Sequence, residues 1–271
     1  MKNNIIIRAL TGAVFVSALL YSLWIGGIVF LLFFGAVVFM GTFETVALVA
    51  EKRYSVFALF CASIAMLIFL LINSAKLACC TPIPSEYSDT VYMLLFLIPV
   101  AGLFSGGISK MKLIAAGVTG AALLSISFTM LTTIFSAPNG YMLALAFFCT
   151  IWVYDTFAFL VGIAIGRRRI CESISPKKSW EGAIGGLIFA VGCGAVFFYF
   201  TNILALWQWM LFAVIVCLFG TIGDFCESLL KRYVNAKDSG KIFPGHGGIL
   251  DRFDSAIFAI PFVLLFLQII K

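Results

Sequence analysis

Charged residues are scarce in this chain of 271 residues. Asp, Glu, Lys and Arg together make up 11% of it, whereas about 25% is usual in soluble domains. Hydrophobic residues make up 63%, which excludes an ordinary soluble domain and indicates a polytopic membrane protein. There is one histidine, and the eight cysteines form no Cys-x-x-Cys pair or Cys/His cluster. Neither a zinc site nor a disulfide framework is therefore indicated.

Long apolar runs are what the chain has in abundance. A helix that crosses a bilayer needs about 20 apolar residues. The runs and the polar breaks between them predict an all-α polytopic integral membrane protein with about nine transmembrane helices. We expect the first run to be retained as a helix, because no small-residue cleavage site follows it. The predicted helices span residues 9–25, 28–50, 55–73, 91–107, 113–135, 141–165, 183–201, 205–228 and 255–270.

Basic residues are distributed unevenly over the predicted loops. If the spans alternate in direction, all 18 Lys and Arg residues except Lys76 and Lys271 lie on the side of the N-terminus. The positive-inside rule makes that side cytoplasmic. The net charge of +6 is thus explained by topology, and nothing indicates nucleic acid as a partner. We expect a multi-pass protein of the inner (plasma) membrane with its N-terminus in the cytoplasm.

The polar landmarks divide the chain into two regions. Residues 1–140 have few of them and are predicted to be scaffold helices. Residues 141–271 contain two long, basic loops on the cytoplasmic side and are predicted to be the catalytic transmembrane region. No Walker loop, Rossmann glycine pattern or Ser/His/Asp arrangement occurs in either region.

Four acidic residues lie within or at the ends of predicted spans: Glu44, Asp155, Asp224 and Glu227. A carboxylate inside a membrane costs about 2.5–3.5 kcal/mol even on insertion scales, so each is a functional candidate. For Glu44 and Asp155 the alternative is a hydrated acid near the interface. Asp224 is the stronger candidate, because it shares a helical face with Glu227, Ser228 and Lys231 at spacings of i+3, i+4 and i+7. Such a face suits Mg²⁺ and a phosphate bound to it.

A second acidic pair begins the last predicted span. Asp251 and Asp254 are three residues apart at a helix N-terminus, where the helix dipole alone also favours acids. The turn Pro-Gly-His-Gly-Gly at 244–248 precedes them, and its backbone N–H groups can approach an anion closely. Its His246 is equally compatible with a structural hydrogen-bonding role.

The loop after residue 165 contains further basic groups. Arg167, Arg168 and Arg169 are compatible with a simple positive-inside anchor. The segment Ser175-Pro-Lys177-Lys178-Ser-Trp-Glu-Gly182 combines hydroxyls, two ammonium groups and a helix N-terminus, which suits polyphosphate. Upstream, Asp155 begins a stripe of small residues that on its own is typical of helix packing. Together these parts predict a cytoplasmic site for Mg²⁺ and phosphates.

The polar segment near the C-terminus resembles a known signature. It reads Ser228-x2-Lys231-Arg232-x4-Lys237-Asp238-x-Gly240-x3-Pro244-x-His246-Gly247-Gly248-x2-Asp251-Arg252-x-Asp254. This run is similar, position by position, to the signature of the phosphatidate cytidylyltransferase (CDP-diacylglycerol synthase) family. The segment 175–182 and the Asp155-Thr-x-Ala158 element resemble other landmarks of that family, so the motif-bearing part covers roughly residues 150–260. One departure is that Phe157 and Phe159 flank Ala158, where the family often has a tyrosine nearby.

The resemblance implies a reaction and a set of roles. CTP and phosphatidic acid would give CDP-diacylglycerol and pyrophosphate, with Mg²⁺, a potassium ion beside it, and a homodimer. The expected metal ligands are Asp224 and Asp251, supported by Glu227 and Asp254. The expected catalytic residues are Asp224, Asp251, Lys231 and His246. The expected substrate-binding residues are Asp155, Ser175, Lys177, Lys178, Ser228, Arg232, Lys237, Asp238, Gly247, Gly248 and Arg252.

Two other functions compete with this one. A CTP-dependent polyprenol or phytol-type lipid kinase would transfer the γ-phosphoryl group to an alcohol and release CDP instead of pyrophosphate. A transporter would use intramembrane acids for ion coupling, but here the acids gather at one end of the spans and no repeated broken-helix pattern occurs.

Overall fold

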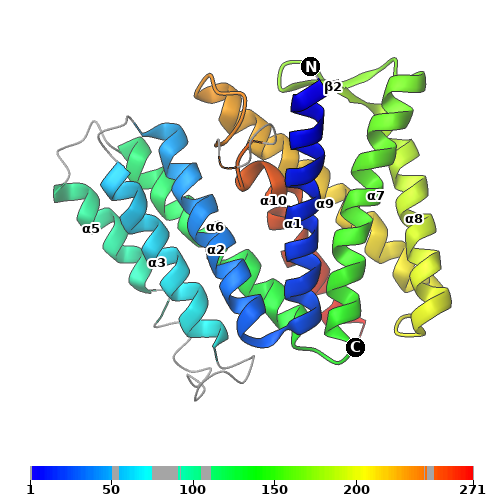
Figure 1. The fold of residues 1–271 in the computed structure, drawn as a ribbon, viewed down its shortest axis with the longest axis horizontal. Helices are drawn as coiled ribbons and strands as arrows, with labels where there is room; N and C mark the ends of the chain where they lie inside the picture. Colours follow the sequence, from blue (N-terminus) through cyan, green and yellow to red (C-terminus); the bar gives the residue numbers. More distant parts are fainter. Residues whose placement is uncertain are drawn as a thin grey trace. The chain divides into compact units, whose positions relative to one another are not determined.

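The described part of the chain is helical almost throughout, as Figure 1 shows for the computed structural model. The structure describes residues 2–50, 55–74, 91, 93–104, 111–240, 242 and 247–270. The elements are α1 (Lys2–Ile25), α2 (Gly27–Val49), α3 (Ser55–Asn73), the 3-10 helix η3 (Met93–Phe96), α5 (Leu97–Phe104), α6 (Met111–Phe135), α7 (Gly140–Ile165), β1 (Arg169–Cys171), β2 (Ser175–Ser179), α8 (Trp180–Thr201), α9 (Leu206–Tyr233) and α10 (Leu250–Ile269). The prediction of an all-α polytopic membrane protein is confirmed.

Seven helices of the described part are long and apolar enough to cross a membrane: α2, α3 and α6 to α10. The predicted break at Gly26–Gly27 is present, since α1 ends at Ile25 and Gly26 has a φ of 65°. The predicted helix 91–107 is instead split into η3 and the eight-residue α5. Pro99 lies in the first turn of α5, where a missing N–H is tolerated. The total of nine spans therefore stays a prediction.

A short antiparallel hairpin was not predicted. β1 and β2 pair across the turn 172–174, with Arg169 opposite Ser179 and Cys171 opposite Ser175. The hairpin leads directly into α8, which begins at Trp180, three residues before the predicted start at 183. Ser179 caps α8, because its hydroxyl accepts a hydrogen bond from Gly182 N at 3.2 Å. The basic segment 175–179 is thus an ordered strand rather than an irregular loop.

By its contacts the chain separates into two compact units. Unit 1 consists of Met1–Ser136 and Tyr233–Phe253, and unit 2 consists of Ala137–Arg232 and Asp254–Lys271. In unit 1, α2, α3 and α6 pack side by side. Phenylalanines join its parts: the ring of Phe128 lies 5.4 Å from that of Phe34 and 5.4 Å from that of Phe253. The first turn of α10 is therefore anchored in unit 1. The division at residue 140 into scaffold helices and a catalytic region stays a prediction.

In unit 2, α7 and α8 lie against each other along their length (Figure 1). The small-residue stripe of α7 faces the glycines of α8, so this stripe does serve helix packing. On the other faces of the two helices, large apolar side chains such as Ile163 and Ile188 are exposed, as expected of surfaces that meet lipid. The C-terminal half of α9 and the hairpin complete the part of unit 2 that carries the polar residues.

Candidate active site

The C-terminal end of α9 presents a polar face, as the sequence periodicity predicts. The hydroxyl of Ser228 donates to Asp224 Oδ1 at 3.3 Å, one turn away. Glu227, which is buried, forms an ion pair with Lys231, also one turn away. These two contacts place Asp224, Glu227, Ser228 and Lys231 on one side of the helix. The face combines hard oxygen ligands with an ammonium group.

A third acid joins the two of α9. One carboxylate oxygen each of Asp224, Glu227 and Asp254 lies within 4.8 Å of the others. Asp254 comes from α10, and Gly223 allows α10 to approach, because a Cβ there would lie 2.5 Å from Asp254 O and 2.9 Å from Phe258 Cβ. Three carboxylates so close together repel one another, so they favour a bound cation. We call Asp224, Glu227 and Asp254 the acidic cluster; together they can hold a metal ion.

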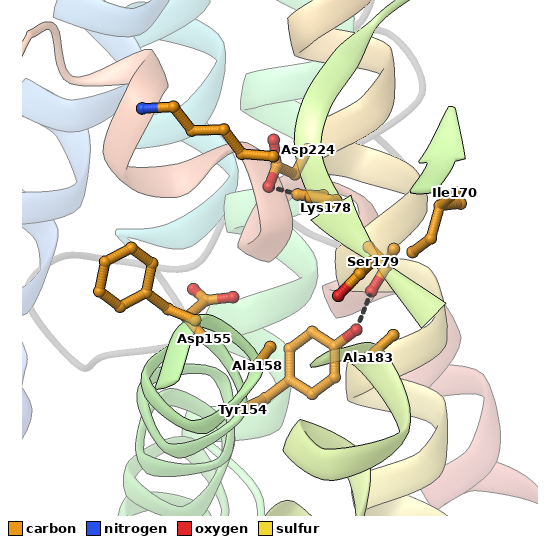
Figure 2. A pocket seen from close by; sticks show the side chains of 11 residues that line it. Tyr154, Asp155, Ala158, Ile170, Lys178, Ser179, Ala183 and Asp224 are labelled. Carbon is orange, nitrogen blue, oxygen red and sulfur yellow. Dashed lines mark hydrogen bonds and ion pairs between the residues drawn. The ribbon is translucent and has the colours of Figure 1, made fainter. Parts of the chain in front are cut away.

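The β1–β2 hairpin contributes basic groups to the same site. Lys178 Nζ forms an ion pair with Asp224, drawn as a dashed line in Figure 2, and also lies 4.7 Å from the centre of the Phe225 ring. At the hairpin turn, Ile174 O accepts a hydrogen bond from Arg232 Nε at 3.4 Å. Lys178 and Lys231 thus each pair with one acid of the cluster. Two ammonium groups thus lie beside the carboxylates of the acidic cluster, and groups of this kind can bind phosphate.

A pocket of about 250 Å³ opens beside the Lys178–Asp224 pair (Figure 2). Its polar groups come from α7, β2 and α9, and its apolar wall comes from α7, β1 and α8. The residues that line it are Tyr154, Asp155, Ala158, Phe159, Ile170, Lys177, Lys178, Ser179, Ala183, Thr221 and Asp224. The predicted residues Asp155, Lys177, Lys178 and Asp224 are therefore brought together around one cavity.

Tyr154 is a pocket residue that the sequence reasoning missed. Its hydroxyl lies 2.7 Å from Thr221 Oγ1, and this contact joins α7 to α9 one turn before Asp224. The sequence drew attention to Phe157 and Phe159 because no tyrosine stands beside Ala158. A tyrosine one turn earlier occupies the same side of α7 as Ala158, so helical spacing was the available signal.

The other predicted carboxylate, Asp251, belongs to unit 1. Its Oδ2 atom accepts hydrogen bonds from Ser239 N, Ser239 Oγ and Gly248 N, each at 2.8 Å. The Asp251 side chain is therefore held by the segment between α9 and α10. Its predicted role as a metal ligand stays a prediction, as does the role of Arg252 beside it.

The remaining predicted residues lie on the hairpin and on the connection between α9 and α10. Ser175 is paired in β2, and Lys237 and Asp238 are exposed. Gly247 and Gly248 precede α10, with Gly247 at a φ of 82°. His246 lies outside the described residues.

The packing at Gly223 yields a test of the acidic cluster. We expect Gly223→Ala to lower turnover by about 10–100-fold, because the added methyl group has to push α10 and Asp254 away from α9. Gly192→Ala is the matched control, since a Cβ there would meet no described side chain or neighbouring helix within 4 Å and alanine favours a helix. Initial rates of both purified variants measure the effect; equal rates would show that the position of Asp254 is unimportant.

The fold and the site together describe a polytopic membrane protein with acids, lysines and a pocket at one end of its helices. The sequence pattern of the cytidylyltransferase family matches residues 6–270. The chain belongs to this family, and so to the nucleotidyltransferases.

Its relatives carry a more specific name. The phosphatidate cytidylyltransferase of Staphylococcus haemolyticus is 31% identical over 246 residues, which cover 83% of this chain and 94% of that protein. That of Bacillus subtilis is 41% identical over 120 residues, 44% of this chain and 45% of the relative. That of Haemophilus influenzae is 38% identical over 133 residues, 47% of this chain and 46% of the relative.

Proposed function

We propose that the protein transfers the cytidylyl group of CTP to phosphatidic acid, which gives CDP-diacylglycerol and pyrophosphate for phospholipid synthesis. The observation that carries this proposal is the acidic cluster with its two lysines beside a pocket, in a membrane protein of the cytidylyltransferase family. The substrates are one water-soluble polyanion and one lipid anion, and a site on membrane helices can reach both. The lipid kinase alternative is not favoured, since the curated relatives are phosphatidate cytidylyltransferases.

The chemistry requires little activation of the nucleophile. A phosphate monoester has a second pKa near 6, so phosphatidic acid is largely a dianion at neutral pH. One of its oxygens attacks the α-phosphorus of CTP and forms the new P–O bond. The bond from that phosphorus to the bridging oxygen of the β-phosphate breaks, and pyrophosphate leaves with the electron pair. The protein has to position two polyanions and neutralise the charge that develops.

The acidic cluster fits a divalent cation, because three carboxylates lie together on buried or half-buried positions. We propose Mg²⁺ at Asp224, Glu227 and Asp254, with Asp251 as a further ligand and potassium as the neighbouring ion. A bound Mg²⁺ would offset the negative charge of the phosphates.

The basic residues of this chain then bind the phosphates themselves. Lys177 and Lys178 extend from β2 at the pocket, and Lys231 and Arg232 from the end of α9. Ser228 orients Asp224 through its hydrogen bond. Ser175, Lys237, Asp238, Gly247, Gly248 and Arg252 complete the proposed substrate contacts. His246 needs no role as a base, since the nucleophile carries no proton that has to be removed.

We further propose that the site faces the cytoplasm, that the protein lies in the inner membrane, and that it works as a homodimer. The distribution of the basic residues supports this orientation. Labelling of cysteines introduced at Glu172 and Lys237 would test it in intact cells.

One assay decides between the two reactions on CTP. Purified protein with labelled CTP and phosphatidic acid is expected to form a CDP-lipid and pyrophosphate in a 1:1 ratio. The product is expected to disappear when Mg²⁺ is removed with a chelator and to return when Mg²⁺ is restored. Release of CDP together with a phosphorylated lipid alcohol would instead support the kinase.

A further inference from the structure

Glu44 is a buried carboxylate in α2, within the part of the chain that the sequence indicated as scaffold. Glu44 is 3% exposed, so the alternative prediction of a hydrated acid near the membrane interface is wrong for this residue. Glu44 Oε2 accepts hydrogen bonds from Ser239 Oγ at 3.0 Å and from Leu250 N at 2.9 Å. Glu44 Oε1 accepts one from Ile249 N at 3.1 Å. Each of these donors lies in or next to the described residues of the connection between α9 and α10, 234–240 and 247–249, which we call the signature loop.

Two glycines let the signature loop close onto this carboxylate. A Cβ at Gly240 or at Gly248 would overlap the oxygens of Glu44, so any side chain at either position would displace the loop. Both glycines belong to unit 1, as does Glu44. The glycine-rich character of the signature loop is therefore explained in part by a contact with α2 and not only by a bound phosphate.

Ser239 connects Glu44 to Asp251. The hydroxyl of Ser239 lies 3.0 Å from Glu44 Oε2 and 2.8 Å from Asp251 Oδ2. Its oxygen also accepts a hydrogen bond from Asp251 N at 3.3 Å. A hydroxyl has one proton to donate, so the two carboxylates share it. Whatever changes at Glu44 thus alters how firmly the Asp251 carboxylate is held.

We infer that Glu44 is a positioning residue for cytidylyl transfer: it fixes the signature loop and, through Ser239, orients the carboxylate of Asp251. The inference rests on the proposed function, in which Asp251 and the loop serve the reaction. Glu44 touches neither substrate in this role, because it acts from the buried face of the loop. Residues that hydrogen-bond to a metal ligand commonly contribute about 10–100-fold to metal affinity or activity.

A merely structural role for Glu44 predicts different experimental results. If the carboxylate only satisfied the first N–H groups of α10, its loss would reduce the amount of folded protein and leave the kinetics of the folded fraction unchanged. If it positions the loop, the folded enzyme itself changes. The two roles are separated by kinetic constants per folded enzyme and by local amide exchange.

The test compares Glu44→Gln with Thr45→Val in the full-length protein in detergent. An amide keeps the size of the side chain but presents an NH₂ group to at least one of the three donors. Thr45→Val is the matched control on α2, since Thr45 is buried and donates only to Gly41 O of its own helix at 2.8 Å. Both variants are assayed for kcat and for KM of CTP, with the folded fraction measured by thermal unfolding.

For Glu44→Gln we expect kcat/KM per folded enzyme to fall by about 10–100-fold. Amide exchange in peptides that contain Gly248–Leu250 should become about tenfold faster without CTP or Mg²⁺. Thr45→Val should change neither. Unchanged kinetics of folded Glu44→Gln, or unchanged exchange at Gly248–Leu250, would overturn the inference. Because the exchange is read without turnover, an inactive wild type would count against the proposed function alone.

A second variant keeps the test valid if Glu44→Gln does not fold. Ser239→Ala leaves Glu44 bonded to the N–H groups of α10 and removes only the shared hydroxyl. Like Glu44→Gln, it should lower kcat/KM and make the amide exchange of Gly248 faster. If kcat/KM and the amide exchange of Gly248 are the same in Ser239→Ala as in the wild type, Ser239 does not connect Glu44 to Asp251.

Discussion

Replacement of Asp224 by Asn is expected to abolish the formation of CDP-diacylglycerol while the protein still inserts and purifies. Asp224 contacts Ser228 and Lys178 and belongs to the acidic cluster, so its charge is central to the site. Loss of one charged ligand of a catalytic ion removes several kcal/mol of transition-state stabilisation, which corresponds to a loss of at least about 10³-fold. Initial rates at saturating CTP and phosphatidic acid measure it.

The control for this variant is another acid of unit 2. Glu172 lies exposed in the turn between β1 and β2, so Glu172→Gln should retain wild-type turnover. Equal yields of both variants from membranes would show that the loss is catalytic. Normal activity of Asp224→Asn would remove the acidic cluster from the mechanism.

Replacement of Lys178 by Met is expected to change two properties in opposite directions. Because Lys178 pairs with Asp224, its ammonium group competes with a cation for that carboxylate. Without it, the concentration of Mg²⁺ that gives half-maximal activity should fall. Turnover should nevertheless drop by about 10²–10³-fold, since a charge that stabilises the transition state at the α-phosphorus of CTP is lost.

Arg167 offers the comparison for Lys178. It is exposed, and its backbone N–H, not its side chain, donates to Glu181 Oε2 at 3.1 Å. Arg167→Gln should therefore alter neither turnover nor the response to Mg²⁺. A Lys178→Met enzyme with full turnover would exclude this lysine from phosphate binding, whatever its response to Mg²⁺.

Local patterns predicted the local parts of the site. The spacing of Asp224, Glu227, Ser228 and Lys231 placed them on one helical face, and the contacts between them follow from helix geometry alone. The approach of Asp254 to this face, by contrast, follows from the packing of α10 against Gly223, which the spacing along α9 does not indicate.

Contacts between segments that lie far apart in the chain could not be predicted from local patterns in a single sequence. Nothing near Glu44 indicates that its donors lie in the signature loop, and the sequence placed it in a scaffold region. The hairpin was missed because Ser175–Ser179 is polar and contains a proline, without the alternation that marks a strand. The pairing of Lys178 with Asp224 depends on that hairpin.

The contact of Glu44 with the signature loop also sets an order of events during biosynthesis. Ser239 and Leu250 follow Glu44 by 195 and 206 residues in the chain. At about 5–20 residues per second, a ribosome needs roughly 10–40 s to reach them. During that time α2, which is long and apolar enough to cross a membrane, carries a carboxylate whose donors have not yet been made, and an acid inside a membrane is costly. Translation pauses or C-terminal truncations before Leu250 would prolong this vulnerable state, and membrane quality-control proteases would have that long to act on the nascent chain.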